Sequence, residues 1–264
     1  MLKRHSKKVN NVTMSYIDEG SGDPIVLIHG FCGSPGYFEE VIPLLSKNHR
    51  VIAPALRGHG KSSAINEVYT IDDMAEDIKL LLEELNLNKV KMFGHSLGGY
   101  VTLAFAGNYP EILSSFGLVH STAFPDNEDA KEGRLRNIEL ICESGIEPLI
   151  NNLVPKLFSP QNSNLLIDQV QHVREIGLNT SVTGAKGALR AMRERPDRNE
   201  ILIKSNVPIL LIAGEDDQII PVEKVFSHKS PLIRQVVLEG VGHLGMIEDP
   251  GKLSEVILDF TMSL

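Results

Sequence analysis

The sequence has no tryptophan, only two cysteines and no long apolar run. Cys32 and Cys142 lie far apart and form neither a CxxC pair nor a zinc-binding spacing, so we expect two free thiols. No apolar run reaches the ~18 residues that a membrane span needs. No cluster of His, Asp or Glu has the spacing of metal ligands. The sequence therefore predicts no membrane segment, no metal and no organic cofactor.

Basic residues are fewer than acidic ones, 26 against 34. The formal net charge is −8, and no block of Lys and Arg extends beyond the first eight residues, which argues against a nucleic-acid partner. Polar residues follow that basic start, where a secretion signal would have its apolar region. We therefore expect a cytoplasmic protein whose partner is a small molecule.

Strand-like and helix-like segments alternate through the first half of the chain. Asn10-Asn11 lies inside an alternating stretch over 7–17, which predicts a hairpin. After it, we expect strands at 25–28, 50–54, 90–93 and 114–120, and helices at 37–46 and 70–85. Alternation of this kind predicts a mostly parallel sheet with helices on both faces.

The pattern changes between 121 and 199. Four helical segments occur there without a convincing strand, at 129–143, 147–158, 163–176 and 183–195. Strand and helix signals resume at 208–213, 222–227, 235–238 and 250–262. The predicted organisation is one α/β core made of 1–120 and 200–264, doubly wound, with a helical lid at 121–199 inserted in it.

A serine between glycines follows the predicted strand at 90–93. In Gly94-His95-Ser96-Leu97-Gly98, the residues after the serine are small and favour a helix. A serine held on a sharp turn between strand and helix needs small neighbours, because the backbone passes close to other chain segments there. The pattern predicts a nucleophilic serine; a chance match in a loop is the alternative.

Two later loops contain the partners that such a serine requires. A serine hydroxyl is a weak nucleophile and needs a base that an acid orients. Glu215, Asp216 and Asp217 follow one predicted strand, and His243 follows the next. Asp126 is another possible acid, although we expect it to be a solvated residue at the start of the insertion.

One competing motif concerns phosphate binding. The stretch from Ala55 to Ser62 nearly spells a P-loop, but no helix begins at Lys61 to hold a phosphate. We therefore expect a turn. Arg190, Arg193 and Arg195 suggest an anionic substrate, yet acidic residues lie among them, and a solvated charged face is the expected reading.

Four motifs resemble those of the α/β-hydrolase superfamily, in its lid-bearing serine esterase-like branch. They are Ile28-His29-Gly30-Phe31, Arg57-Gly58-His59-Gly60-Lys61-Ser62, the segment from Gly94 to Gly99, and the paired acid and histidine loops. The resemblance implies Ser96 as nucleophile, Asp217 as orienting acid and His243 as general base. It also implies that the backbone N–H groups of Phe31 and Leu97 form an oxyanion hole.

The resemblance implies a serine hydrolase, most simply a carboxylesterase acting on small to medium esters or related carbonyl compounds. Carbon–carbon bond hydrolases share this order of residues, and receptors of this fold turn over little, so both remain alternatives. The lid is expected to shape the substrate pocket. The candidate pocket residues are His120, Leu153, Leu157 and Phe158.

Overall fold

The chain begins with an antiparallel hairpin. In the computed structural model, which describes residues 2–263, β1 (Arg4–Val9) pairs with β2 (Val12–Glu19). Asn10 in the turn has φ of +54°, a conformation that asparagine tolerates better than most residues. The predicted hairpin is confirmed, and it places β1 at one edge of the sheet with Arg4 and Lys8 exposed.

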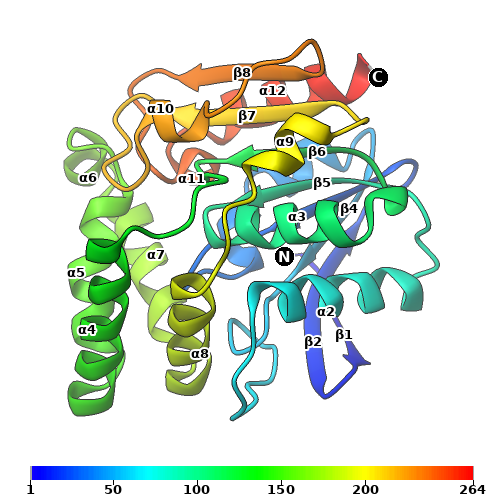
Figure 1. Cartoon of the computed structure of the whole chain (residues 1–264). Coiled ribbons are helices and arrows are strands. Elements are labelled where there is room, and N and C mark those ends of the chain that lie inside the picture. The colour runs from blue at the N-terminus through cyan, green and yellow to red at the C-terminus, as the bar shows by residue number, and fades with distance from the viewer. Residues whose placement is uncertain (1, 264) are drawn as a thin grey trace.

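The other strands complete one eight-stranded sheet in the order β1-β2-β4-β3-β5-β6-β7-β8 (Figure 1). In the described part of the chain, the two pairings of β2 are antiparallel and all the others are parallel. The six parallel strands are β3 (Pro24–Ile28), β4 (Arg50–Pro54), β5 (Val90–His95), β6 (Leu113–Val119), β7 (Ile209–Gly214) and β8 (Ile233–Leu238). The inner strands are apolar runs with almost every residue buried, because helices cover both faces.

The helices of this sheet region follow its strands. They are α1 (Ile42–Leu45), α2 (Ile71–Glu84), α3 (Leu97–Asn108), α10 (Val222–Val225), α11 (Gly245–Glu248) and α12 (Pro250–Met262), with 3-10 turns η1 (Pro35–Phe38) and η2 (Pro110–Ile112). Helix α2 starts as predicted. The Thr70 hydroxyl accepts a hydrogen bond from the Asp73 N–H, and the Asp73 carboxylate accepts one from the Thr70 N–H.

The single helix predicted at 37–46 is wrong. The structure has η1 and α1 there, separated by a turn. Pro43 lacks an N–H, so it is tolerated only in the first turn of a helix, and α1 accordingly starts at Ile42.

Six helices follow one another in the chain between β6 and β7. They are α4 (Glu128–Ser144), α5 (Glu147–Leu157), α6 (Asn162–Leu165), α7 (Ile167–Leu178), α8 (Val182–Arg193) and α9 (Asn199–Lys204). Helices α4 to α8 lie at the carboxyl ends of the strands, whereas α9 packs against α3 (Figure 1). Helix α4 packs against α8, and α5 against α7. The segment predicted as one helix at 163–176 is two helices, α6 and α7, because the backbone dihedral angles of Leu166 are not helical. Helix α9 was not predicted.

Helix α8 meets the loop after β4 backbone to backbone. A Cβ atom on Gly58, whose φ is +75°, would lie 2.3 Å from the Cα atom of Gly184. The Tyr69 hydroxyl donates to the carbonyl oxygen of Gly184 over 3.1 Å. Only glycine fits at this contact, which fixes the start of α8 against the sheet region.

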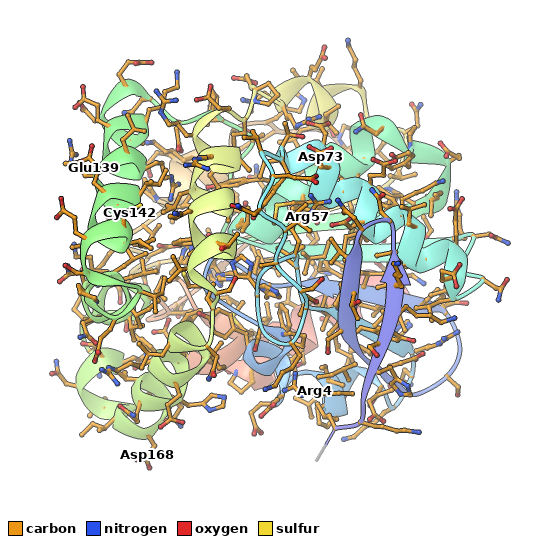
Figure 2. All side chains as sticks on the ribbon, turned by 90° about the horizontal axis from the view of Figure 1, so that it is seen from below. Arg4, Arg57, Asp73, Glu139, Cys142 and Asp168 are labelled. Carbon is orange, nitrogen blue, oxygen red and sulfur yellow. The ribbon has the colours of Figure 1, made fainter. Side chains whose placement is uncertain are left out.

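The stretch that resembles a P-loop forms a turn, as expected, and the next helix after it, α2, begins only at Ile71. Its Arg57 is buried and donates to the Asp77 carboxylate over 2.7 Å and to the Asp73 carbonyl oxygen over 3.2 Å. Arg57 and Asp73 are labelled in Figure 2. The arginine therefore anchors α2, and the turn has no helix N-terminus for a phosphate.

Two expectations from composition can be checked in the part of the chain that the structure describes. Both cysteines are free, with Cys32 buried and Cys142 exposed. Within residues 2–263, no helix combines the length and the apolar character that crossing a membrane requires.

Candidate active site

Ser96 occupies the sharp turn between β5 and α3. Its φ of 50° and ψ of −115° lie outside the regions that a serine normally adopts, so surrounding contacts must hold it. Its N–H donates to the Val119 carbonyl oxygen over 3.1 Å. Its carbonyl oxygen accepts from the Ser121 hydroxyl over 2.7 Å and from the Gly99 N–H over 2.8 Å. The backbone, rather than the side chain, fixes this serine.

The glycines around Ser96 are required by close contacts. A Cβ atom on Gly94 would lie 2.1 Å from the carbonyl oxygen of Gly98. A Cβ atom on Gly98 would lie 2.2 Å from the carbonyl oxygen of Ile28. Any larger residue would separate α3 from β3 and β5 and release the turn.

His243 and Asp217 form a buried pair at the carboxyl ends of β8 and β7. The Nδ1 atom of His243 lies 2.7 Å from Oδ2 of Asp217. The other carboxylate oxygen accepts from the N–H groups of Ile219, over 2.8 Å, and Ile220, over 3.0 Å. Burial alone would raise the pKa of Asp217, but His243 and these donors outweigh it, and the pKa lies below its usual value.

Backbone hydrogen bonds also fix His243. Its N–H donates to the Leu157 carbonyl oxygen and its carbonyl oxygen is bonded by Nε2 of His95, both over 2.8 Å. The rings of His95 and His243 pack with centroids 4.9 Å apart. Leu157 ends helix α5, so the helices between β6 and β7 also contribute to the position of this imidazole.

The alternative acids are placed elsewhere. Glu215 and Asp216 are exposed, and Glu215 accepts from the Gly240 N–H over 2.9 Å. Of the three acids in this loop, Asp217 is the one that bonds to His243.

The expectation that Asp126 is solvated is wrong. Asp126 is 8% exposed, and its carboxylate accepts from Nε of Arg134 over 3.0 Å and from Nη1 of Arg195 over 2.6 Å. Arg195, expected on a solvated face, is buried with its guanidinium 3.9 Å from the centre of the Tyr100 ring. These partners lie 8 and 69 residues along the chain, where no sequence pattern links them.

Ser96 and His243 line the same small cavity of about 60 Å³. Among the described residues no hydrogen bond joins their side chains, which is common before substrate binds. The other lining residues come from six parts of the chain: Phe31, Tyr37, His95, Tyr100, Arg134, Leu153, Leu157, Met192 and Ile219. Most of them were missed by sequence reasoning. Two of the missed residues had a local signal: His95 directly precedes Ser96, and Tyr100 lies one helical turn after it.

The predicted pocket residues divide into two pairs. Leu153 and Leu157 line the cavity. His120 and Phe158 do not, because both are fully enclosed by protein. Nε2 of His120 accepts from the Gly245 N–H over 3.2 Å, and Nδ1 lies 3.9 Å from Asp217 Oδ2. Burial lowers the pKa of His120 to about 3, so it is a neutral core histidine.

Phe31 and Leu97 each keep a backbone N–H without a partner. Within residues 2–263, neither N–H donates a hydrogen bond to the protein. Leu97 is the first residue of α3, where helical N–H groups have no partner within the helix. The loop beside Phe31 is closed by a bond from the Gly33 N–H to the Gly30 carbonyl oxygen, over 3.0 Å. Two free donors are thus available near Ser96.

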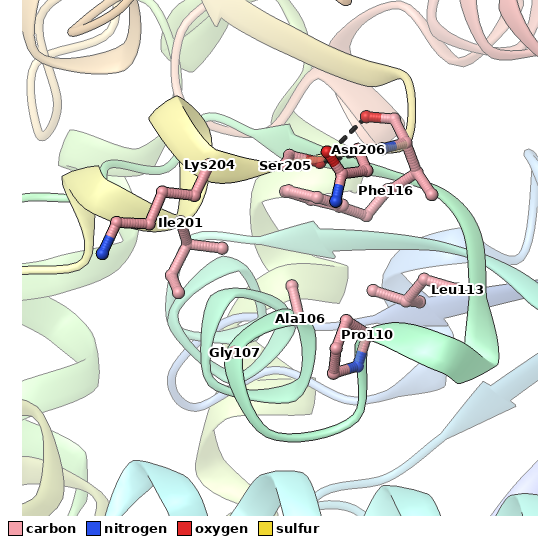
Figure 3. A pocket seen from close by; sticks show the side chains of 10 residues that line it. Ala106, Gly107, Pro110, Leu113, Phe116, Ile201, Lys204, Ser205 and Asn206 are labelled. Carbon is pink, nitrogen blue, oxygen red and sulfur yellow. Dashed lines mark hydrogen bonds between the residues drawn. The ribbon is translucent and has the colours of Figure 1, made fainter.

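A second, larger cavity of about 360 Å³ lies at the opposite, amino-terminal ends of β6 and β7 (Figure 3). Its lining includes Lys204, Ser205 and Asn206, and the Ser205 hydroxyl donates to the Val207 carbonyl oxygen over 2.9 Å. No histidine or carboxylate is among its lining residues in the described chain. It therefore offers no base for a serine nucleophile.

Comparisons with known proteins identify relatives that share this fold. A family model described as "alpha/beta hydrolase fold" matches residues 23–250. A putative carbamate hydrolase from Pseudomonas savastanoi is 29% identical over 245 residues, covering 89% of this chain and 92% of that protein. The acetyltransferase component of an acetoin-cleaving system from Pseudomonas putida is 29% identical over 244 residues. That match covers 90% of this chain and only 63% of the relative's length.

Among solved structures, a thermophilic esterase from Thermogutta terrifontis, with malate bound, superposes with a TM-score of 0.94. It is 29% identical, and the match covers 99% of this chain and 98% of that one. The structural similarity therefore extends over nearly the whole of both chains.

Proposed function

Because the chain belongs to the family with the alpha/beta hydrolase fold, we propose that it is a serine hydrolase that cleaves small to medium carboxylic esters. The observation that carries the proposal is the buried hydrogen bond between His243 and Asp217, at a cavity that Ser96 shares. A nucleophile, a base and an acid that orients the base are the parts that acyl transfer through serine requires.

In the proposed mechanism the Ser96 hydroxyl attacks the ester carbonyl carbon while His243 takes its proton. The negative charge moves to the carbonyl oxygen, where the N–H groups of Phe31 and Leu97 stabilise it. The intermediate then collapses, and His243 gives the proton to the leaving alcohol. Water, deprotonated by His243, next attacks the acyl-enzyme and releases the acid and the serine.

Asp217 serves this cycle by holding one tautomer of His243. Its carboxylate accepts the Nδ1–H bond, so Nε2 carries the lone pair that takes the serine proton. The two backbone donors on the other carboxylate oxygen keep Asp217 ionised and oriented.

The helices between β6 and β7 act as a lid in this proposal. Leu153 and Leu157 of α5 and Met192 of α8 face the same cavity as Ser96. A cavity of about 60 Å³ holds only a few non-hydrogen atoms, so short acyl groups are favoured over long ones.

The test is to measure kcat/KM on p-nitrophenyl acetate and p-nitrophenyl octanoate for the wild type and Ser96→Ala. We expect acetate to be preferred and the variant to lose on the order of 10⁶ in kcat, as serine triads do. Ser6→Ala, on the exposed edge strand β1, is the matched control and keeps full activity. A Ser96→Ala enzyme with a tenth of the wild-type rate contradicts the nucleophile, and a wild type inactive on both esters contradicts the esterase proposal.

A further inference from the structure

Within residues 2–263, Arg134 is the one permanently charged side chain among those that line the catalytic cavity. Its neighbours there are aromatic, apolar, hydroxyl or imidazole groups. Burying a cation in such surroundings costs free energy unless an anion pairs with it. The chain as a whole carries a net charge of −8, so this position is not explained by a general excess of arginine.

Among the described residues, Asp126 pairs with only one of the three guanidinium nitrogens of Arg134. Nε donates to Oδ2 of Asp126, and within residues 2–263 neither terminal nitrogen donates to another residue. The other acidic side chains nearby on α4 pair elsewhere: Glu128 with Lys131 and Glu132 with Arg136. The outer edge of the Arg134 guanidinium, with its two parallel N–H groups, remains available.

Asp126 also bonds to Arg195, so two guanidinium groups share one carboxylate and leave one positive charge in excess. Arg195 is buried, and its two terminal nitrogens are occupied, because they also donate to the carbonyl oxygens of Met192, over 2.9 Å, and Phe124, over 3.1 Å. Burial raises the pKa of Asp126, but the two arginines outweigh it and the net shift is downward. The carboxylate therefore stays ionised at neutral pH, and the excess charge falls on Arg134 at the cavity.

We infer that the preferred substrates carry a carboxylate in addition to the ester, and that the free edge of Arg134 binds it. This inference rests on the proposed hydrolase function and narrows its substrate class. A planar carboxylate matches two parallel N–H groups of a guanidinium. The volume of about 60 Å³ favours a short spacer between the two carbonyl groups.

The test compares two esters of nearly equal shape, monomethyl succinate, which is an anion, and methyl 4-oxopentanoate, which is neutral. Ester hydrolysis is followed by pH-stat titration in the wild type, Arg134→Gln, Arg134→Lys and Arg136→Gln. We expect the wild type to prefer the anion in kcat/KM. Arg134→Gln should lower that preference by about 10- to 100-fold, mainly through KM, as expected for a lost hydrogen bond to a charged group.

Arg136→Gln is the matched control, because Arg136 lies on the same helix with its side chain 66% exposed, and it should leave the preference unchanged. Arg134→Lys should keep part of it, since the charge remains without the two parallel donors. Turnover of the neutral ester reports that each variant is folded. Equal kcat/KM for both esters in the wild type, or a preference that survives Arg134→Gln, overturns the inference.

Calorimetry separates this inference from the proposed function. Monomethyl succinate is titrated into Ser96→Ala and into the double variant Ser96→Ala/Arg134→Gln, with methyl 4-oxopentanoate as the neutral reference. Binding of the anion alone, lost with Arg134, supports the inference even if the wild type hydrolyses neither ester. Absence of anion binding to Ser96→Ala overturns it, even if the neutral ester is hydrolysed.

Discussion

The sheet region and the helices between β6 and β7 hold their cavity residues by different means. In the sheet region the backbone fixes the position: Ser96 is held through its own N–H and carbonyl oxygen, and His243 likewise. In the helices, contacts between side chains fix the positions, as in the hydrogen bonds of Arg134 and Arg195 with Asp126. Backbone constraints tolerate little change, whereas side-chain contacts can be replaced one at a time. The chemistry is thus expected to be rigid and the choice of substrate adjustable.

The largest effect is expected on replacing Asp217, the acid that bonds to His243. Asp217→Asn should lower kcat on p-nitrophenyl acetate by about 10⁴-fold, because an amide no longer holds the required tautomer of His243. Asp216→Asn, one residue earlier and exposed, is the control and should change kcat little. We expect Asp126→Asn, in the helical region, to lower kcat much less than Asp217→Asn does. Equal losses would contradict the view that the sheet region carries the chemistry and the helices determine the choice of substrate.

The next effect comes from one chemical change made in both regions. Gly98→Ala in α3 places a Cβ atom 2.2 Å from the Ile28 carbonyl oxygen, and we expect it to lower the free energy of unfolding by roughly 3–5 kcal/mol. Gly133→Ala in α4 meets nothing closer than the Arg136 guanidinium at 3.8 Å. It should raise the free energy of unfolding by about 0.5–1 kcal/mol. Urea unfolding measures both changes. If the two variants change the free energy of unfolding in the same direction, the proposed difference between the two regions is wrong.

The last effect concerns how the free energy of unfolding depends on pH. Burial lowers the pKa of His29 to about 3, of His59 to about 4 and of His120 to about 3. All three lie in the sheet region and stay neutral when folded, whereas the unfolded chain binds protons below about pH 6.5. The free energy of unfolding should therefore fall as pH drops from about 6.5 towards 4, approaching about 1.4 kcal/mol per pH unit for each histidine.

Urea unfolding at pH 7.5, 6.5 and 5.5 tests this dependence. His172 in α7 is exposed, so His172→Gln should leave the slope unchanged. Hydrogen exchange at the lower pH should show β3 and β6 losing protection. An unfolding free energy that is constant from pH 7.5 to 5.5 would mean that the buried histidines are not held neutral.

The same contrast explains what could be predicted from the sequence. The turn at Ser96 was recognisable because its close backbone contacts demand glycines at fixed spacing. The loops with Asp217 and His243 were recognisable because each follows the end of a parallel strand. The strand pattern also gave the parallel sheet, since buried strands are continuous apolar runs.

Residues placed by packing between distant segments were not predictable in this way. Asp126 was expected to be solvated, yet it is buried by Arg195, 69 residues further along. Tyr37 and Met192 lie far apart along the chain and belong to no common motif, yet both line the cavity. His120 and Phe158 were placed near the substrate on type and position alone, and full burial removes both from the cavity lining.

The strand order has a further consequence, for contacts between separate copies of the chain. A sheet with β1 and β8 at its ends leaves two rows of backbone groups open to pairing with another chain. On β1, the exposed Arg4 and Lys8 would bring like charges together if two such edges approached each other. On β8, the exposed residues are Arg234 and Val237, which repel a second copy less. Aggregation of partly unfolded chains is therefore expected to start at β8 rather than at β1.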